Sequence, residues 1–212
     1  MNLNQRTFED LTAYRDDLPI PEVVKKRLDF AMSKTEGAVL DYGCGTGRYS
    51  KRLTYTRIVY GVEPVESAFK VAQNNGLFRW NGEKVNAVIC VEVFEHLVNP
   101  EENIKEIYNA LNPGGYLFLT VPNAAWWKHR VNLLRGKLSY VENDGYNTAN
   151  NPHIRMWTPR TMKAFLRSNG FEIFPAYHWG TYAGFPGGSQ LMELTGNYDL
   201  FSAGVVILAE KR

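Results

Sequence analysis

Two carboxylates and an imidazole occupy the short run Glu92-Val-Phe-Glu95-His96. Glu92 and Glu95 are three positions apart, so one turn of the chain can present both carboxylates together with His96. Oxygen and nitrogen ligands of this kind suit a divalent cation such as Mg²⁺ or Mn²⁺. An imidazole in the same place can also remove a proton from a hydroxyl without a metal. The segment therefore predicts a metal site or acid–base chemistry, and the plainest alternative is a histidine that only holds the loop.

A glycine-rich turn, Asp41-Tyr-Gly-Cys-Gly-Thr-Gly47, follows a short apolar run. Alternate glycines can adopt positive φ and let a ligand approach the backbone closely. Arg48 stands where the dinucleotide fingerprint G-x-G-x-x-G requires its third glycine. Asp41 suits a ligand that carries an amino group and would repel a pyrophosphate. The turn therefore predicts a nucleotide-like cofactor other than a dinucleotide.

A second acid, Glu63, ends the apolar run at 57–62 and follows Asp41 by 22 residues. An acid at about this distance, at the tip of the second strand, is placed to accept both hydroxyls of a ribose. Together with the turn, Glu63 narrows the predicted ligand to an adenosyl cofactor.

Strands alternating with helices must position these groups. We expect strands at 38–42, 57–62, 86–91, 116–121, 171–177 and 204–209, and helices at 5–16, 21–34, 47–54, 65–74 and 100–111. A further helix should begin at Thr158-Pro159, which supplies an N-cap and a proline, and end at Gly170. A third strand is hard to place in the short connection 77–84. The order predicts an α/β fold with a doubly wound, Rossmann-like sheet, mostly parallel with a C-terminal antiparallel strand, and helices on both faces.

Four blocks of the chain resemble the class I S-adenosylmethionine-dependent methyltransferases in order and spacing: the turn at 41–47, the acid Glu63, and the runs 85–97 and 111–123. The resemblance implies S-adenosylmethionine as the cofactor. It implies cofactor contacts from Asp41, Gly43, Cys44, Gly45, Gly47, Glu63, Pro64, Phe78, Trp80, Val91 and Glu92. Phe78 and Trp80 are candidates to stack on the adenine, and the alternative is that they only cover the sheet edge.

The E-x-x-E-H pattern resembles two methyltransferase groups in which it binds a divalent metal. These are the ubiquinone-biosynthesis O-methyltransferases and the small-RNA 3′-terminal 2′-O-methyltransferases, and in the latter a second histidine completes the site. Here the resemblance implies a metal set of Glu92, Glu95, His96 and His153. The same "E-H-L" sequence also occurs in members without a metal, where the catalytic role falls to the histidines alone, here His96 and His153.

The insertion at 124–157 lies where this family recognises the methyl acceptor. It carries two tryptophans and the basic or potentially basic residues Lys128, His129, Arg130, Arg135 and Lys137, which could stack a ring and neutralise an anionic acceptor. The alternative is an amphipathic lid helix whose Trp127, Val131 and Leu134 pack downward, with a solvated basic outer face.

Composition places the chain among ordinary globular domains. A length of 212 residues fits a single domain, 1–212, with N-terminal helices in 1–35, and 44% hydrophobic with 22% charged residues argues against disorder. The net charge of +2 makes a nucleic-acid partner a weak expectation. The chain has no apolar run long enough for a membrane span, and its two cysteines suggest no disulfide framework, so we expect a cytoplasmic protein.

Taken together, the pattern favours a methyltransferase acting on a hydroxyl of a small acceptor such as a sugar, a quinone or phenol, or a glycan precursor. The run His153-Ile-Arg-Met-Trp-Thr-Pro159 resembles small bacterial enzymes of this kind. Methylation of an RNA 3′ end, N-methylation and a non-catalytic cofactor-binding module remain alternatives. An NAD(P)-dependent dehydrogenase is disfavoured by Arg48 and by the lack of a Tyr-x-x-x-Lys pair. The sequence does not predict the oligomeric state.

Overall fold

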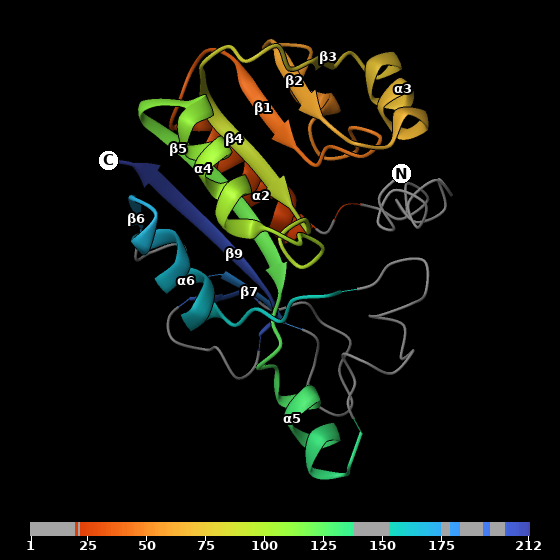
Figure 1. Ribbon diagram of the computed structural model, residues 1–212, viewed down its shortest axis with the longest axis vertical. Helices are drawn as coiled ribbons and strands as arrows, with labels where there is room; N and C mark the ends of the chain where they lie inside the picture. Colours follow the sequence, from red (N-terminus) through yellow and green to blue (C-terminus); the bar gives the residue numbers. More distant parts are fainter. Residues whose placement is uncertain (1–19, 21, 138–152, 175–178, 183–192, 196–201) are drawn as a thin grey trace.

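A single mixed sheet forms the centre of the molecule. The computed structural model describes residues 20, 22–137, 153–174, 179–182, 193–195 and 202–212. Within them nine strands form the sheet: eight follow the order β3-β2-β1-β4-β5-β9-β7-β8, and the ninth, β6, pairs with β9 (Figure 1). The strands are β1 Val39–Tyr42, β2 Val59–Val62, β3 Phe78–Arg79, β4 Val85–Val91, β5 Leu111–Pro122, β6 Phe171–Ile173, β7 Trp179–Tyr182, β8 Glu193–Thr195 and β9 Ser202–Lys211.

The first five strands are parallel and the C-terminal strands are antiparallel. β1 pairs with β2 and β4 in parallel, and β2–β3 and β4–β5 are also parallel. β9 runs antiparallel to β5, β6 and β7. This confirms the predicted Rossmann-like sheet with a C-terminal antiparallel strand. Because parallel strands end at one edge of a sheet, the residues that follow β1, β2, β4 and β5 lie together there.

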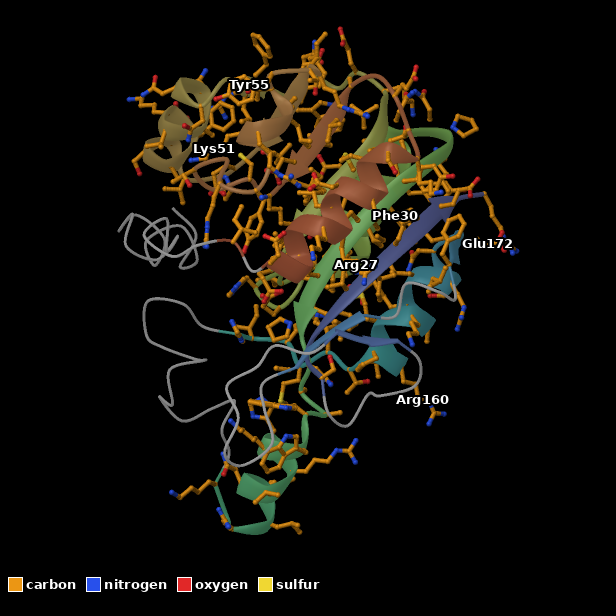
Figure 2. The ribbon with its side chains drawn as sticks, turned by 180° about the vertical axis from the view of Figure 1, so that it is seen from behind. Arg27, Phe30, Lys51, Tyr55, Arg160 and Glu172 are labelled. Atoms are coloured by element: carbon orange, nitrogen blue, oxygen red, sulfur yellow. The ribbon has the colours of Figure 1, made fainter. Side chains whose placement is uncertain are left out.

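Helices cover both faces of the sheet, as predicted. They are α2 Glu22–Ser33, α3 Glu66–Asn74, α4 Pro100–Ala110, α5 Trp127–Leu134 and α6 Pro159–Ser168. Leu28 of α2 and Phe69 of α3 belong to one apolar cluster, whereas Ile104 of α4 and Met162 of α6 belong to the other. Seen from behind, α2 lies in front of the sheet and carries Arg27 and Phe30 (Figure 2). In the part of the chain that the structure describes, no helix has both the length and the apolar character to cross a membrane.

One sequence prediction beside the glycine turn is wrong. No α-helix forms at 47–54, where the structure has only the 3₁₀ turn η2, Lys51–Leu53. Gly47 has φ +79°, which no right-handed helix accepts, and the amides of Ser50 and Leu53 bond to the third residue before them. A third strand does exist, because β3 pairs Phe78 with Tyr60 of β2. A strand of two residues carries no periodicity that a sequence could reveal.

The remaining boundaries agree with the sequence within a few residues. α2 covers most of the predicted helix at 21–34, and Thr158 caps α6 through a reciprocal hydrogen bond with Thr161. β9 is longer than the predicted strand at 204–209, because it is paired on both sides. The predicted helix at 5–16 and the last part of the strand at 171–177 lie outside the described residues. Cys44 and Cys90 are both unpaired and buried.

Candidate functional site

The glycine turn packs closely against the neighbouring strands. Gly43, Gly45 and Gly47 all have positive φ, between 53° and 79°. A Cβ atom at Gly43 would lie 2.6 Å from Cγ2 of Val93, in the loop after β4. The glycines therefore meet two needs at once: a left-handed backbone and a close approach between the turn and that loop.

The amides of the turn bond within the protein. The N–H groups of Gly43 and Cys44 donate to the carbonyl of Val62 at 2.8 and 3.0 Å, and Gly47 N–H donates to the carbonyl of Cys44 at 2.8 Å. These bonds fix the turn to the end of β2. The turn is thus a preformed structure rather than a loop waiting for a ligand to organise it.

Asp41 lies beneath the turn at the end of β1 and is almost fully buried. The hydroxyl of Ser50 donates to its carboxylate at 2.5 Å. Burial raises the pKa of Asp41 to about 7, the Ser50 hydrogen bond lowers it in part, and the nearby Glu63 carboxylate raises it further. Asp41 therefore changes charge near neutral pH, which the sequence pattern did not indicate.

Glu63 joins the glycine turn to the segment that follows β2 in the predicted cofactor site. One carboxylate oxygen, Oε2, accepts the N–H of Gly45 at 2.9 Å, and Oε1 accepts the N–H of Val65 at 2.9 Å. The next residue, Pro64, is exposed beside it. A carboxylate oxygen can accept more than one hydrogen bond. Glu63 can therefore organise the turn and still face a ribose.

The carboxyl end of β4 is strained. Glu92 has φ +54°, and among the described residues no other non-glycine has a positive φ. Thr120 on β5 holds it twice: the Thr120 hydroxyl donates to Oε1 of Glu92 at 2.7 Å, and Glu92 N–H donates to the Thr120 carbonyl at 3.1 Å. Val91, the last residue of β4, is buried next to it. A non-glycine left-handed residue costs about 1–2 kcal/mol, and such strain concentrates at functional sites.

Glu95, His96 and His153 come together beyond this strained residue. One ligand atom of each lies within 4.8 Å of the others. His96 Nε2 is 3.6 Å from Glu95 Oε1, and the two imidazole rings meet edge to face with centroids 4.9 Å apart. Glu92 is not a member of this cluster. The structure thus unites three of the four residues in the predicted metal set.

Glu95 is the unusual member of the cluster. Its side chain is 1% exposed, and its carboxyl group lies against that of Glu92. Burial, and then the neighbouring Glu92 carboxylate, raise the pKa of Glu95 well above its usual range. A buried carboxylate of this kind needs a proton or a cation.

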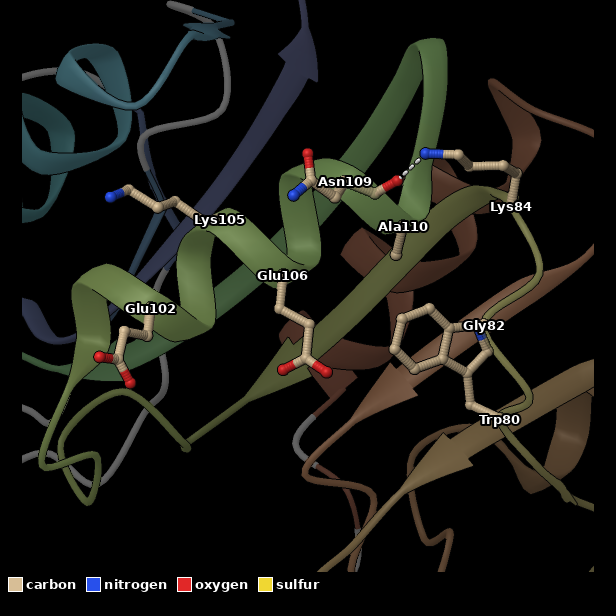
Figure 3. A pocket seen from close by; sticks show the side chains of 8 residues that line it. All are labelled: Trp80, Gly82, Lys84, Glu102, Lys105, Glu106, Asn109 and Ala110. Carbon is tan, nitrogen blue, oxygen red and sulfur yellow. Dashed lines mark hydrogen bonds between the residues drawn. The ribbon is translucent and has the colours of Figure 1, made fainter.

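The two predicted adenine contacts lie at the outer edge of the sheet. Phe78 on β3 is 61% exposed. Trp80 lines a groove of about 510 Å³ between the β3–β4 connection and α4, where its ring faces Ala110 and Glu106 (Figure 3). Its indole N–H donates to the carbonyl of Glu83 at 2.8 Å. The lining of this groove includes no residue of the glycine turn.

The insertion after β5 extends beyond the carboxyl edge of the sheet (Figure 1). Trp126 is buried at the base of α5, and α5 itself has no buried residue. Leu134 is 88% exposed, so the predicted downward packing of this residue is wrong. The exposed basic residues of this insertion are Lys128, Arg130, Arg135 and Lys137. Residues 138–152 of the predicted insertion lie outside the described residues.

Sequence reasoning missed Ser50, Thr120 and Arg155. Ser50 holds Asp41 and Thr120 holds Glu92, while the Arg155 side chain bonds to the loop after β4. Thr120 could have been found, because it lies opposite Val91 at the carboxyl end of the adjacent strand. Ser50 and Arg155 carry no such signal.

Comparison with known proteins identifies the family and agrees with the fold. A family model described as "Methyltransferase domain" matches residues 14–175. The chain is 28% identical over 144 residues to the ubiquinone biosynthesis O-methyltransferase of Vibrio atlanticus, covering 56% of this chain and 61% of that protein. It is 33% identical over 130 residues to the protein of the same name from Actinobacillus pleuropneumoniae, covering 50% and 56% respectively. The chain therefore spans about three-fifths of the length of these relatives.

Solved structures share the fold at low sequence identity. One is a Thermotoga maritima protein described as a SAM-dependent methyltransferase and possible histamine N-methyltransferase, with a TM-score of 0.66 and 20% identity over 99% of this chain and all of that one. Another is the magnesium protoporphyrin IX methyltransferase of Synechocystis with bound SAM, with a TM-score of 0.61 and 14% identity over 100% of this chain and 98% of that one. With a family model that covers most of its length, this chain belongs to the methyltransferase domain family, and its Rossmann-like sheet is the fold of the S-adenosylmethionine-dependent methyltransferases that it resembles.

Proposed function

We propose that this protein transfers a methyl group from S-adenosylmethionine to a hydroxyl oxygen of a small acceptor. The observation that carries the proposal is the cluster of Glu95, His96 and His153 at the carboxyl end of β4, where this fold binds its ligands. The names of the relatives as O-methyltransferases support the same chemistry. A sugar, a quinone or phenol, or a glycan precursor would fit, and the basic face of α5 favours an anionic one.

The cofactor would lie along the glycine turn. Asp41 faces the amino group of the methionine part, Glu63 the ribose hydroxyls, and Glu92 with Val91 closes the side toward β4. Pro64 and Phe78 remain the proposed contacts on the adenine side, whereas the predicted contact from Trp80 has less support because Trp80 lines the groove against α4. The support for this placement is the shared position of the strand ends at one edge of the sheet.

Methyl transfer is an in-line displacement in which one bond forms as another breaks. The acceptor oxygen attacks the methyl carbon, and the sulfonium leaves as the neutral thioether S-adenosylhomocysteine. The hydroxyl proton passes to the cluster of Glu95, His96 and His153. The protein must align oxygen, carbon and sulfur and provide this proton acceptor.

The same cluster fits a divalent metal. Glu95 offers a buried carboxylate, and His96 and His153 add two imidazoles within reach of it. One oxygen and two nitrogen ligands suit a borderline divalent ion such as Mn²⁺. When bound, such an ion would lower the pKa of the acceptor hydroxyl.

The proposal is tested by methyl transfer from labelled S-adenosylmethionine to a catechol, a free sugar and a primary amine, each with Mn²⁺ or with EDTA. We expect a methyl ether as product, and EDTA should lower the rate at least about tenfold, as loss of a polarising ion would. Restoration by Mn²⁺ would support the metal site. An undiminished rate in EDTA would assign proton removal to the histidines alone. Methylation of the amine only, or no transfer to any acceptor, would contradict the proposal.

Asp41 should make cofactor binding depend on pH. Because its pKa lies near 7 in the free protein, Asp41 is largely neutral at pH 6 and cannot pair with an ammonium group. We expect S-adenosylhomocysteine to bind more weakly as the pH falls below 7, by up to about tenfold per pH unit, with release of a proton on binding at pH 6. Calorimetry in buffers of different ionisation enthalpy measures both quantities.

Asp41→Asn should remove the pH dependence and the proton release. The matched control is Asp29→Asn, because Asp29 is a half-exposed aspartate that pairs with Arg52 at the surface. A pH dependence that persists in Asp41→Asn would show that another group binds the ammonium.

A further inference from the structure

Three residues of the segment 153–157, namely Ile154, Arg155 and Trp157, attach this segment to the loop after β4. The backbone N–H groups of Ile154 and Arg155 both donate to the carbonyl of Glu95, at 2.9 and 3.0 Å. Residues 154 and 155 thus bond to the backbone of a residue whose side chain belongs to the Glu95–His96–His153 cluster. This contact joins two segments that are nearly 60 residues apart in the sequence.

Arg155 adds a second, side-chain attachment to the same loop. Its Nε donates to the carbonyl of Leu97 at 2.9 Å, and its Nη2 donates to the carbonyl of Val98. The side chain is half-buried, and among the described residues it forms no ion pair within salt-bridge distance. A guanidinium has a planar fork of donors that can reach two successive carbonyls at once, which the single ammonium of a lysine cannot reproduce. The site uses the shape of the guanidinium.

Trp157 attaches the other end of the segment. Its indole N–H donates to the carbonyl of Phe94 at 3.1 Å, and its ring packs edge-on against the Phe94 ring with centroids 6.4 Å apart. The carbonyl of Trp157 accepts the N–H of Ala124 at 2.8 Å. Four carbonyls of the loop, those of Phe94, Glu95, Leu97 and Val98, therefore accept hydrogen bonds from residues 154–157.

We propose that Arg155 is a positioning residue that sets His153 against His96 and Glu95 by clamping the segment 153–157 to the loop at 94–98. The inference rests on the proposed function of the Glu95–His96–His153 cluster and says how that cluster is assembled. His153 precedes the clamped residues directly, so the clamp fixes where its backbone enters the site. A displacement of about 1 Å at a reacting group can cost about 100-fold in rate, so such a clamp matters for catalysis.

The test compares Arg155→Met and Arg155→Lys with a matched control, Arg160→Met. Arg160 is exposed on α6 and points away from the sheet (Figure 2). Three properties of the full chain are measured: the nuclear Overhauser effect between the ring protons of His96 and His153, the affinity for added Mn²⁺ by electron paramagnetic resonance, and the affinity for S-adenosylhomocysteine. Thermal unfolding checks that each variant is folded.

Both Arg155 variants should lose the contact between the two imidazole rings. They should also bind Mn²⁺ at least about tenfold more weakly, because removing a residue that orients a metal ligand weakens other metal sites by about this factor. Their affinity for S-adenosylhomocysteine should stay near the wild-type value, since the glycine turn is not part of the clamp. Arg160→Met should match the wild type throughout. If the Arg155 variants fail to fold, Trp157→Phe takes their place. It removes only the indole donor at the other end of the segment, and it should weaken the same contact between the two imidazole rings.

Retention of the ring contact in Arg155→Met would overturn the proposal. Wild-type behaviour of Arg155→Lys would overturn the role of the fork, because lysine keeps the charge and loses the geometry. A third outcome separates the two proposals: the wild type binds no Mn²⁺ but shows the ring contact, and Arg155→Met lacks the ring contact. The metal part of the proposed function then fails, whereas the positioning role of Arg155 is supported.

Discussion

Replacing His153 with alanine is expected to lower kcat for methyl transfer at least about 100-fold, the lower range for loss of a group that handles the acceptor proton. His153 lies against His96 and Glu95, whereas the glycine turn, which is the proposed cofactor site, consists of other residues. The affinity for S-adenosylhomocysteine should therefore change little. Steady-state kinetics with a saturating acceptor and calorimetry with S-adenosylhomocysteine measure the two effects separately.

A double variant decides whether the two imidazoles act as one unit. If they do, His96→Ala combined with His153→Ala should be hardly slower than either single variant, because effects within one catalytic unit are not additive. Multiplication of the two single effects would instead mean that the histidines act independently. A kcat for His153→Ala within a few-fold of the wild type would leave His153 with a structural role only.

Replacing Glu63 with glutamine is expected to weaken the binding of S-adenosylhomocysteine about 100-fold. The carboxylate accepts two backbone N–H groups, those of Gly45 and Val65, and an amide has only one oxygen to offer them. Both of these bonds are already present without ligand, so their loss loosens the turn, and the loss of affinity comes mainly from a weaker contact with the ribose hydroxyls. A hydrogen bond to a charged group contributes about 1.5–3 kcal/mol, and about 1.4 kcal/mol is a factor of ten in affinity. Isothermal titration calorimetry gives the dissociation constants.

Glu66→Gln is the matched control for this change. Glu66 lies three residues away and pairs with Arg79 at the surface, with side chains 62% and 51% exposed. A surface pair of this kind contributes only about 0–1 kcal/mol to stability, and Glu66 makes no bond to the turn. Equal losses in the two variants would mean that Glu63 acts only through general charge, whereas a selective loss would support its double role.

The order of elements could be predicted because it depends on local pattern. The run 85–91 is almost wholly apolar, and it forms β4, which is buried on both faces. Thr158 and Pro159 are an N-cap and a first-turn proline, and they begin α6 as expected. The predicted helix at 47–54 does not form, because Gly47 takes a left-handed conformation and Ser50 is hydrogen-bonded to Asp41. Such tertiary demands override a helical pattern.

The candidate site was predictable in its residue types and only partly in its assembly. Asp41, Glu63 and Glu92 follow strands, so their shared edge could be expected once a parallel sheet was predicted. The hydrogen-bond partners of these acids could not be predicted from the sequence. Ser50 on Asp41 and Thr120 on Glu92 depend on how the turn folds back and on the register of β4 against β5.

The sequence by itself determined the glycine turn, the acids at the strand ends and the methyltransferase family, because glycine spacing and apolar periodicity are local properties. The tertiary structure alone decided which residues of the predicted metal set come together: Glu95, His96 and His153 do, whereas the Glu92 carboxylate accepts a hydrogen bond from Thr120. The physical reason is that hydrogen bonds from residues 154–157 to the carbonyls of a distant loop, rather than any local preference, place His153 beside them.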